Sequence, residues 1–203
     1  VLELLSVIQW ARQTNTQKFN KNFYKLAYPD VMYNYIAWNN KNPLFVDKRV
    51  RQALAQLIDV KTINEKLNFG LGTVVTGPFF PLSKQYNSNV QPFTYNIEEG
   101  RKLLSDAGWV DHDGDGILDR AGKKFAFTFL YPSASVAAER LSTVLKEELK
   151  NVGIDMTIER LEWGAFLDKI IKREFDSFML AWTIKYEYDP FQIWDSSQAD
   201  VPG

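Results

Sequence analysis

Residues 125–182 of the chain run FAFTFLYPSASVAAERLSTVLKEELKNVGIDMTIERLEWGAFLDKIIKREFDSFMLAW and contain its most regular hydrophobic pattern. Apolar side chains occupy every second position over 125–129 and again over 154–158, as in half-buried β-strands. A short apolar run over 178–182 predicts a third strand.

Two helices are predicted between these strands. Apolar residues recur at intervals of three and four residues over 141–152 and again over 163–171, which is the spacing of one buried helix face. The order strand, helix, strand, helix, strand builds parallel strands joined by right-handed crossovers. We therefore predict an α/β fold with a mixed, mostly parallel sheet flanked by helices.

The sequence before this stretch adds a strand and a helical pair. Residues 33–38 are rich in tyrosine, isoleucine and tryptophan, which suit a pleated, half-buried surface. Asp47 and Asp59 can each cap a helix, and we expect the second helix to stop at Gly70, where a left-handed residue costs little.

A connection and a further helix follow. The glycines and prolines of residues 69–90 predict an irregular segment at the surface. Asn96, with Glu99 three residues later, forms a capping-box pattern, so a helix is expected from there to Gly108.

Composition limits the classes of function. The chain has 203 residues, 45% of them hydrophobic, which is enough for a sizeable core. Its 24 basic and 25 acidic residues provide no broad positive surface for nucleic acid or for an anionic membrane, and we expect neither partner. No apolar run approaches the roughly 20 residues that span a bilayer. The lack of cysteine excludes disulfides and thiolate chemistry.

The segment WVDHDGDGILDR, residues 109–120, matches the first half of a calcium-binding EF-hand loop. Gly116 falls where that loop turns sharply, but Gly122 stands where its bidentate glutamate should be, so water would have to complete the shell. The alternative is a plain turn whose carboxylates accept hydrogen bonds from their own backbone amides. The candidate ligands of a structural Ca²⁺ are Asp111, Asp113, Asp115, Asp119 and the carbonyl of Ile117.

Catalytic groups are few. The only histidine is His112, inside the same loop, so the chain alone builds neither a histidine-based triad nor a two-histidine metal site. Pairs of carboxylates remain, but they arise easily by chance among 25 acidic residues. We predict that the chain is not an enzyme. The alternative is a carboxylate-dependent hydrolase that uses Glu187 or Asp189.

Aromatic side chains crowd the stretch after the last predicted strand. In parallel sheets, ligands usually bind outside the carboxyl ends of the strands, and rings with polar tips suit a wet pocket. A covered edge of the core is the alternative explanation. The aromatic residues are Trp182, Tyr186, Tyr188, Phe191 and Trp194.

Residues 39–81, NNKNPLFVDKRVRQALAQLIDVKTINEKLNFGLGTVVTGPFFP, resemble the characteristic segment of family 5 extracellular solute-binding proteins, the oligopeptide, dipeptide and nickel receptors of ABC importers. The resemblance covers nearly the whole chain, more weakly over residues 1–32. The further matching motifs are Tyr95-Asn96, Ala107-Gly108-Trp109, the Asp-Gly-Asp-Gly turn, Val152-Gly153-Ile154, Glu162-Trp163, Ala181-Trp182 and Asp189-Pro190.

The resemblance implies a two-lobed, type II periplasmic-binding-protein-like clamshell that closes on its ligand. Residues 1–203 would be a single domain, most of the carboxyl-side ligand-binding lobe of a longer protein. The implied function is delivery of peptides or a similar small solute to the permease subunits of an ABC importer. The implied location is the periplasm or the cell surface, with any membrane contact made through a lipid anchor outside these residues.

The resemblance also points to ligand-binding residues. Peptide-binding members that resemble this chain hold the peptide's amino terminus with an aspartate three residues after the match to Trp182, and here that position is Lys185. Dipeptide receptors place an arginine at the strand end that Tyr131 occupies here. Either Glu187 or Asp189 binds the ammonium instead, or the ligand is not a short peptide. The expected ligand-binding residues are Trp182, Lys185, Tyr186, Glu187, Asp189 and Tyr131.

A third hypothesis is a sensory ligand-binding domain that reports to a membrane protein other than an importer. Genomic neighbours would separate this role from transport.

Overall fold

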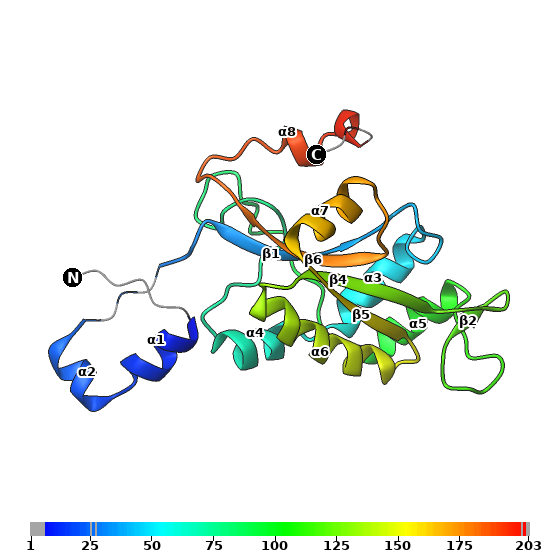
Figure 1. The fold of residues 1–203 in the computed structure, drawn as a ribbon, viewed down its shortest axis with the longest axis horizontal. Helices are drawn as coiled ribbons and strands as arrows, with labels where there is room; N and C mark the ends of the chain where they lie inside the picture. Colours follow the sequence, from blue (N-terminus) through cyan, green and yellow to red (C-terminus); the bar gives the residue numbers. More distant parts are fainter. Residues whose placement is uncertain (1–6, 25, 27, 200, 202–203) are drawn as a thin grey trace.

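The computed structural model describes residues 7–24, 26, 28–199 and 201. Its main sheet has the strand order β1-β6-β4-β5, in which β4 runs parallel to both of its neighbours and β1 runs antiparallel to β6 (Figure 1). The mixed, mostly parallel α/β sheet predicted from the sequence is confirmed. The strands are β1 (Met32–Trp38), β4 (Ala126–Pro132), β5 (Asp155–Leu161) and β6 (Ser177–Thr183).

Helices cover both faces of this sheet, whereas α1 and α2 lie to one side of it (Figure 1). None of the helices in the described part of the chain is long and apolar enough to cross a bilayer. The helices are α1 (Val7–Thr14), α2 (Gln17–Asn22), α3 (Lys48–Leu57), α4 (Val60–Asn68), α5 (Ile97–Asp106), α6 (Val136–Lys150), α7 (Trp163–Ile171), α8 (Phe191–Trp194) and the 3₁₀ turn η1 (Ser196–Gln198).

The predicted helix starts are confirmed by their caps. The side chains of Asp47, Asp59 and Asn96 each accept a hydrogen bond from a backbone N–H in the first turn of α3, α4 and α5. Helix α4 ends in two left-handed residues, Phe69 at φ 54° and Gly70 at φ 71°. The left-handed turn thus begins one residue earlier than predicted. As expected, residues 69–90 contain neither helix nor strand.

The larger core lies between the sheet and helices α3, α5 and α6. Alternate residues of β4 and its flank face this side, and each fully buried phenylalanine contributes roughly 1.5–3 kcal/mol. The strand residues of this cluster are Phe125, Phe127, Phe129, Tyr131, Ile154, Met156 and Met179, and its helix residues include Val50, Leu54, Leu104, Leu145 and Leu149.

A smaller core lies on the opposite face, beneath α7. Phe166 of α7 is fully buried and contacts Phe178 of β6 edge-on, with ring centroids 5.8 Å apart. Leu130 of β4 completes the buried part of this cluster. Successive side chains of β4 therefore face opposite sides of the sheet and pack into both cores, because side chains alternate along a strand.

A polar junction ties the start of β6 to β1 and β4. The Asp176 carboxylate accepts hydrogen bonds from Thr128 N at 2.9 Å and from Asn42 Nδ2 at 2.6 Å. The Asn39 amide donates to the carbonyl of Phe175 at 2.8 Å. These bonds satisfy polar groups at the start of β6 and fix the loop that leaves β1.

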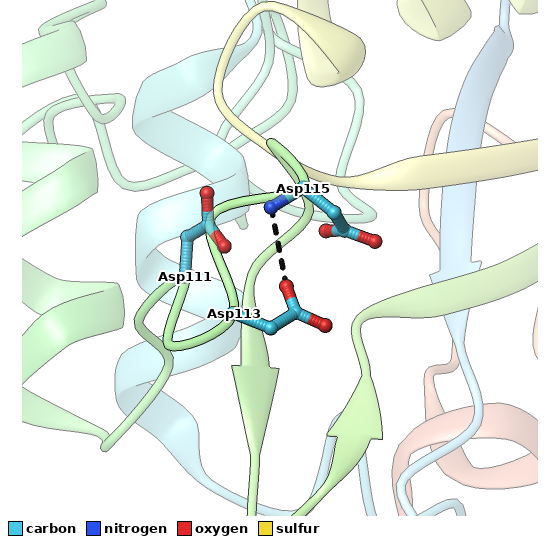
Figure 2. Close-up of side chains that lie close together, drawn as sticks. All are labelled: Asp111, Asp113 and Asp115. Atoms are coloured by element: carbon cyan, nitrogen blue, oxygen red, sulfur yellow. Dashed lines mark hydrogen bonds between the residues drawn. The ribbon is translucent and has the colours of Figure 1, made fainter.

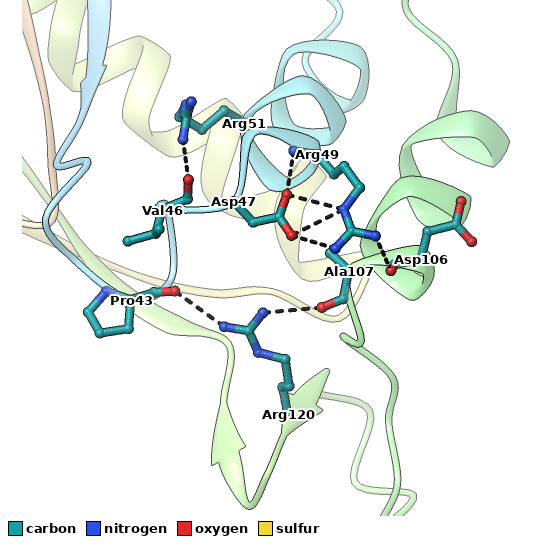
Figure 3. Close-up of polar contacts among 8 residues, drawn as sticks. All are labelled: Pro43, Val46, Asp47, Arg49, Arg51, Asp106, Ala107 and Arg120. Atoms are coloured by element: carbon teal, nitrogen blue, oxygen red, sulfur yellow. Dashed lines mark hydrogen bonds and ion pairs between the residues drawn. The ribbon is translucent and has the colours of Figure 1, made fainter.

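Arginines hold this loop against the end of α5 (Figure 3). Arg49 pairs with Asp47 at 2.6 Å and donates to the carbonyl of Asp106. Hydrogen bonds from the side chain and then from the backbone N–H of Arg49 lower the pKa of Asp47 to about 2. The helix cap therefore stays charged at neutral pH.

Arg120, from the short β2 (Asp119–Arg120), makes a second bridge to α5. It donates to the carbonyls of Ala107 and Pro43 at 3.1 and 3.3 Å, and its guanidinium lies 4.6 Å from the ring centroid of Trp109. Strand β2 pairs with β3 (Lys123–Lys124) in a hairpin that the sequence patterns do not predict. Arginines at the last carbonyls of a helix satisfy acceptors that have no partner within the helix.

Glu148, on α6, lies beside the α4 cap. Its Oε2 atom is buried and has no hydrogen-bond partner among the described residues. Burial, followed by the nearby Asp59 carboxylate, raises the pKa of Glu148 against weaker opposing effects of the Asp59 backbone and of Lys66. A raised carboxyl pKa means that the folded state binds the proton more tightly than the unfolded state does.

We therefore expect Glu148→Gln to raise the melting temperature at pH 7. The gain should shrink as the pH falls through the raised pKa of Glu148 toward its unfolded value, because wild-type Glu148 then becomes neutral as well. Thermal scans from pH 7 to pH 4 measure this difference. Glu147→Gln, at an exposed neighbouring position, is the control. Equal shifts in melting temperature for both variants would show that burial of the Glu148 carboxylate is not the cause.

Candidate functional site

The aromatic surface predicted after the last strand lies at the carboxyl end of β6. Trp182 is the register partner of Tyr33 on β1, so the two side chains share one face of the sheet. The pairing of β4 with β6 reaches only as far as Phe178, so β1 is the strand that holds Trp182. The rings of Tyr33 and Tyr35 are 5.9 Å apart on the same face.

Tyr33 connects this surface to the segment after β6. Burial, followed by the proximity of Tyr188 and Tyr35, raises the pKa of Tyr33 to about 12. Its hydroxyl therefore stays protonated at neutral pH and can donate a hydrogen bond.

Residues 184–190, which we call the binding segment, pack against the loop of residues 79–86. The Tyr186 hydroxyl donates to the carbonyl of Leu82 at 2.6 Å. Its ring also lies 5.6 Å from that of Phe80. Two segments about a hundred residues apart in the sequence thus form one surface.

The predicted charged residues lie on the exposed side of the binding segment. Lys185 and Glu187 are exposed and form no hydrogen bond or ion pair with the rest of the described chain. Asp189 is also exposed, but its carboxylate accepts a hydrogen bond from Phe191 N at 3.0 Å at the start of α8. Glu187 is therefore freer than Asp189 to bind a cation.

The other predicted residues differ in accessibility. Tyr186 is 52% exposed and Trp182 is partly buried. Tyr131 is only 4% exposed and packs in the larger core with Phe129, apart from the exposed residues of the binding segment. The structure thus places Trp182 beside Tyr33, Tyr186 against the loop of residues 79–86, and Tyr131 in the interior.

Three residues of this surface were missed from the sequence: Tyr33, Phe79 and Gln85. The alternation of Tyr33 and Tyr35 predicts their strand, but it does not predict that β6 pairs with it. Phe79 and Gln85 lie in a glycine- and proline-rich segment that has no periodic pattern. No local signal links them to Tyr188, which both contact.

A surface hollow of about 470 Å³ lies elsewhere, at the other end of β6. It is lined by the polar junction around Asp176, and Lys169 and Glu159 in its wall pair with each other at 2.8 Å. Its polar groups serve the joining of strands and helices, so we place the candidate site at the aromatic surface instead.

The aspartate-rich loop closes on itself through backbone amides. Asp111 accepts hydrogen bonds from Gly114 N at 2.8 Å and Gly116 N at 2.9 Å. Asp113 accepts one from Asp115 N at 3.2 Å (Figure 2). Carboxylate oxygens of these three aspartates lie within 4.8 Å of one another, so the predicted ligands do converge. The hydrogen bonds from the backbone amides are those expected for the alternative, an Asp/Gly turn.

Two of the predicted ligands also have other partners. Asp115 pairs with Lys124 and accepts a hydrogen bond from Ile117 N at 2.9 Å. Asp119 is largely buried, and its two oxygens contact the backbone N–H and the Nδ1 atom of His112 at 2.9 and 3.0 Å. Calcium binding in this loop stays a prediction.

A family model described as bacterial extracellular solute-binding proteins, family 5 Middle, matches residues 3–200. The chain belongs to this family. The resemblance to family 5 that was predicted from the motifs between Asn39 and Asp189-Pro190 is thereby confirmed.

Relatives in the family support the same assignment. The oligopeptide-binding protein AppA of Bacillus subtilis (strain 168) is 38% identical over 170 residues, which cover 82% of this chain and 31% of that protein. The dipeptide-binding protein of Escherichia coli (strain K12) is 26% identical over 166 residues, covering 82% of this chain and 30% of that protein. The chain thus spans about a third of the length of these family 5 relatives.

Solved structures share the fold. The structure of Bacillus subtilis AppA in complex with a nonapeptide superposes with a TM-score of 0.84 at 35% identity, covering 95% of this chain and 38% of that one. NikZ from Campylobacter jejuni in complex with Ni(L-His) gives a TM-score of 0.76 at 24% identity, covering 96% of this chain and 38% of that one. The second likeness concerns the fold alone.

Two hydroxyls of the binding segment provide a matched stability test. The Tyr188 hydroxyl is buried without a partner among the described residues, whereas the Tyr186 hydroxyl is bonded to Leu82. We expect Tyr188→Phe to leave the melting temperature unchanged or raised, and Tyr186→Phe to cost about 0.5–1.5 kcal/mol. Thermal unfolding of both variants measures this. An equal loss for both would show that the Tyr188 hydroxyl has a partner in solution.

The aspartate loop gives a second test. Asp111→Ala removes two amide bonds and should destabilise the protein by about 1–2 kcal/mol in urea unfolding, while Asp113→Ala removes one long bond and should cost about half as much or less. The same measurement with EDTA and with excess calcium tests the metal hypothesis. Stabilisation by calcium that both variants lose would support it, and identical curves would count against it.

Proposed function

We propose that residues 1–203 form most of the carboxyl-side ligand-binding lobe of an exported receptor that delivers peptides or a similar small solute to an ABC importer. Membership of family 5 supports a solute-binding role. AppA, named as an oligopeptide-binding protein and solved with a nonapeptide, supports peptides as the ligand class. The receptor would act in the periplasm or at the cell surface and would contact the permease subunits of its importer.

One observation carries the proposal: the aromatic surface at the carboxyl end of β6 adjoins exposed charges of both signs. Trp182 and Tyr33 offer ring surface and a hydroxyl, which suit side chains and peptide groups together. Lys185 suits a ligand carboxylate and Glu187 a ligand ammonium. Tyr186 and Asp189 complete the proposed contacts. Tyr131, buried in the core, would act by supporting the end of β4.

The proposed role is binding without turnover. The chain's only histidine, His112, is hydrogen-bonded to Asp119 in the aspartate loop. In the described part of the chain no acid or base forms a hydrogen bond or ion pair with Glu187, which favours ion pairing with a ligand over proton transfer. No resident cofactor is proposed, and calcium in the aspartate loop would serve only to stabilise that turn.

Trp182→Ala in the full-length protein tests the proposal. We expect the dissociation constant for bound peptide to rise by about tenfold or more, because truncating a central tryptophan commonly costs more than 1 kcal/mol. The melting temperature without peptide should fall somewhat, because Trp182 is partly buried beside Tyr33, and the variant must still be folded at the temperature of the titration. Isothermal titration calorimetry and thermal scans measure the two quantities.

Tyr95→Ala is the control for Trp182→Ala. Tyr95 is 41% exposed and lies near Glu148. Glu148 belongs to the last turn of α6, away from the carboxyl end of β6. Equal affinities for wild type and the Trp182 variant would remove Trp182 from the site. Cleavage of the added peptide, followed by mass spectrometry, would contradict the binding-only role.

A further inference from the structure

We propose that Gln85 is a positioning residue: its side-chain amide holds the binding segment in the shape that receives the ligand. The inference rests on the proposed function, in which residues 184–190 contact the solute. Gln85 itself is not proposed to touch the ligand.

The contact between Gln85 and Tyr188 runs in both directions. Gln85 Nε2 donates to the carbonyl of Tyr188 at 3.0 Å, and Gln85 Oε1 accepts from the backbone N–H of Tyr188 at 2.9 Å. One side chain thereby satisfies both backbone groups of one residue, as a neighbouring strand would. A primary amide has the donor and the acceptor that this contact needs.

Ring contacts act beside these hydrogen bonds. The ring of Phe79 lies 6.3 Å from that of Tyr188, edge-on, and the ring of Phe80 lies 5.6 Å from that of Tyr186. The Tyr186 hydroxyl adds its bond to Leu82. The loop of residues 79–86 is therefore fastened to both tyrosines of the binding segment.

Glu187 lies between these two fastened tyrosines, and Lys185 directly precedes them. The binding segment has left β6 and contains no helix or ladder of its own, so these side contacts fix its backbone. A flexible segment would lose conformational freedom when it binds the ligand, and this loss would weaken binding. The hydrogen bonds of Gln85 order the segment when the protein folds, so less freedom is lost when the ligand binds.

Three substitutions separate positioning from general stability. Gln85→Ala removes both hydrogen bonds to Tyr188. Gln85→Glu retains an acceptor for the Tyr188 N–H but loses the donor to its carbonyl. Gln91→Ala is the control, because the Gln91 amide donates to Ser88 within its own loop at 3.2 Å.

The experiment measures hydrogen–deuterium exchange and peptide affinity in the full-length protein. Without peptide, we expect Gln85→Ala to raise amide exchange in residues 184–190 by about tenfold, Gln85→Glu to raise it less, and Gln91→Ala to leave it unchanged. The affinity probe is an equimolar mixture of nonapeptides with free termini. Its apparent dissociation constant should rise by about tenfold for Gln85→Ala and by less for Gln85→Glu, and it should stay the same for Gln91→Ala.

The outcomes are distinct. Unchanged exchange in residues 184–190, or faster exchange spread evenly over the whole lobe, would overturn the positioning role. Faster local exchange with unaltered affinity would also overturn it, because the segment's shape would then not matter for binding. If wild type binds none of the nonapeptides, the proposed peptide function fails, whereas the exchange data still decide whether Gln85 holds the segment.

Discussion

The first strand of the sheet, β1, pairs along its full length with the last strand, β6, although most of the chain lies between them. This antiparallel ladder sets the position of everything attached to its two ends. At one end it brings Asn39 to the segment around Asp176, and at the other it brings Tyr33 to Trp182. Because the ladder also carries residues of both cores, the packing of helices on either face depends on its register.

The two ends of this ladder differ in chemistry. At the Asp176 end, carboxylate and amide groups are hydrogen-bonded to neighbouring strands and loops, which builds a rigid junction. At the Trp182 end, rings are partly exposed and charged side chains extend to solvent. A scaffold that is fixed at one end and open at the other fits a lobe that presents a binding surface to a ligand. Gln85 extends that rigidity across to the binding segment.

The aspartate-rich loop carries the most conspicuous motif of the sequence, and its contacts fit a self-contained turn as well as a calcium site. Its carboxylates meet as an EF-hand pattern predicts, yet each also accepts backbone hydrogen bonds, and Asp119 is turned toward His112. The loop lies within residues 3–200, which match the family 5 model, and that match assigns it no role of its own. The less conspicuous Gln85 contacts the proposed binding surface directly.

The sequence by itself determined the α/β class, the helix caps at Asp47, Asp59 and Asn96, and the family, because periodicity and capping are local and the family motifs are contiguous. It also predicted Trp182 and the charged residues after it as ligand contacts, which stays a prediction. Only the tertiary structure decided that β1 pairs with β6, that Tyr131 is buried, and that Phe79 and Gln85 lie against Tyr188. These contacts join residues far apart in the chain, and their geometry follows from how the two cores pack on the sheet, which no local pattern records.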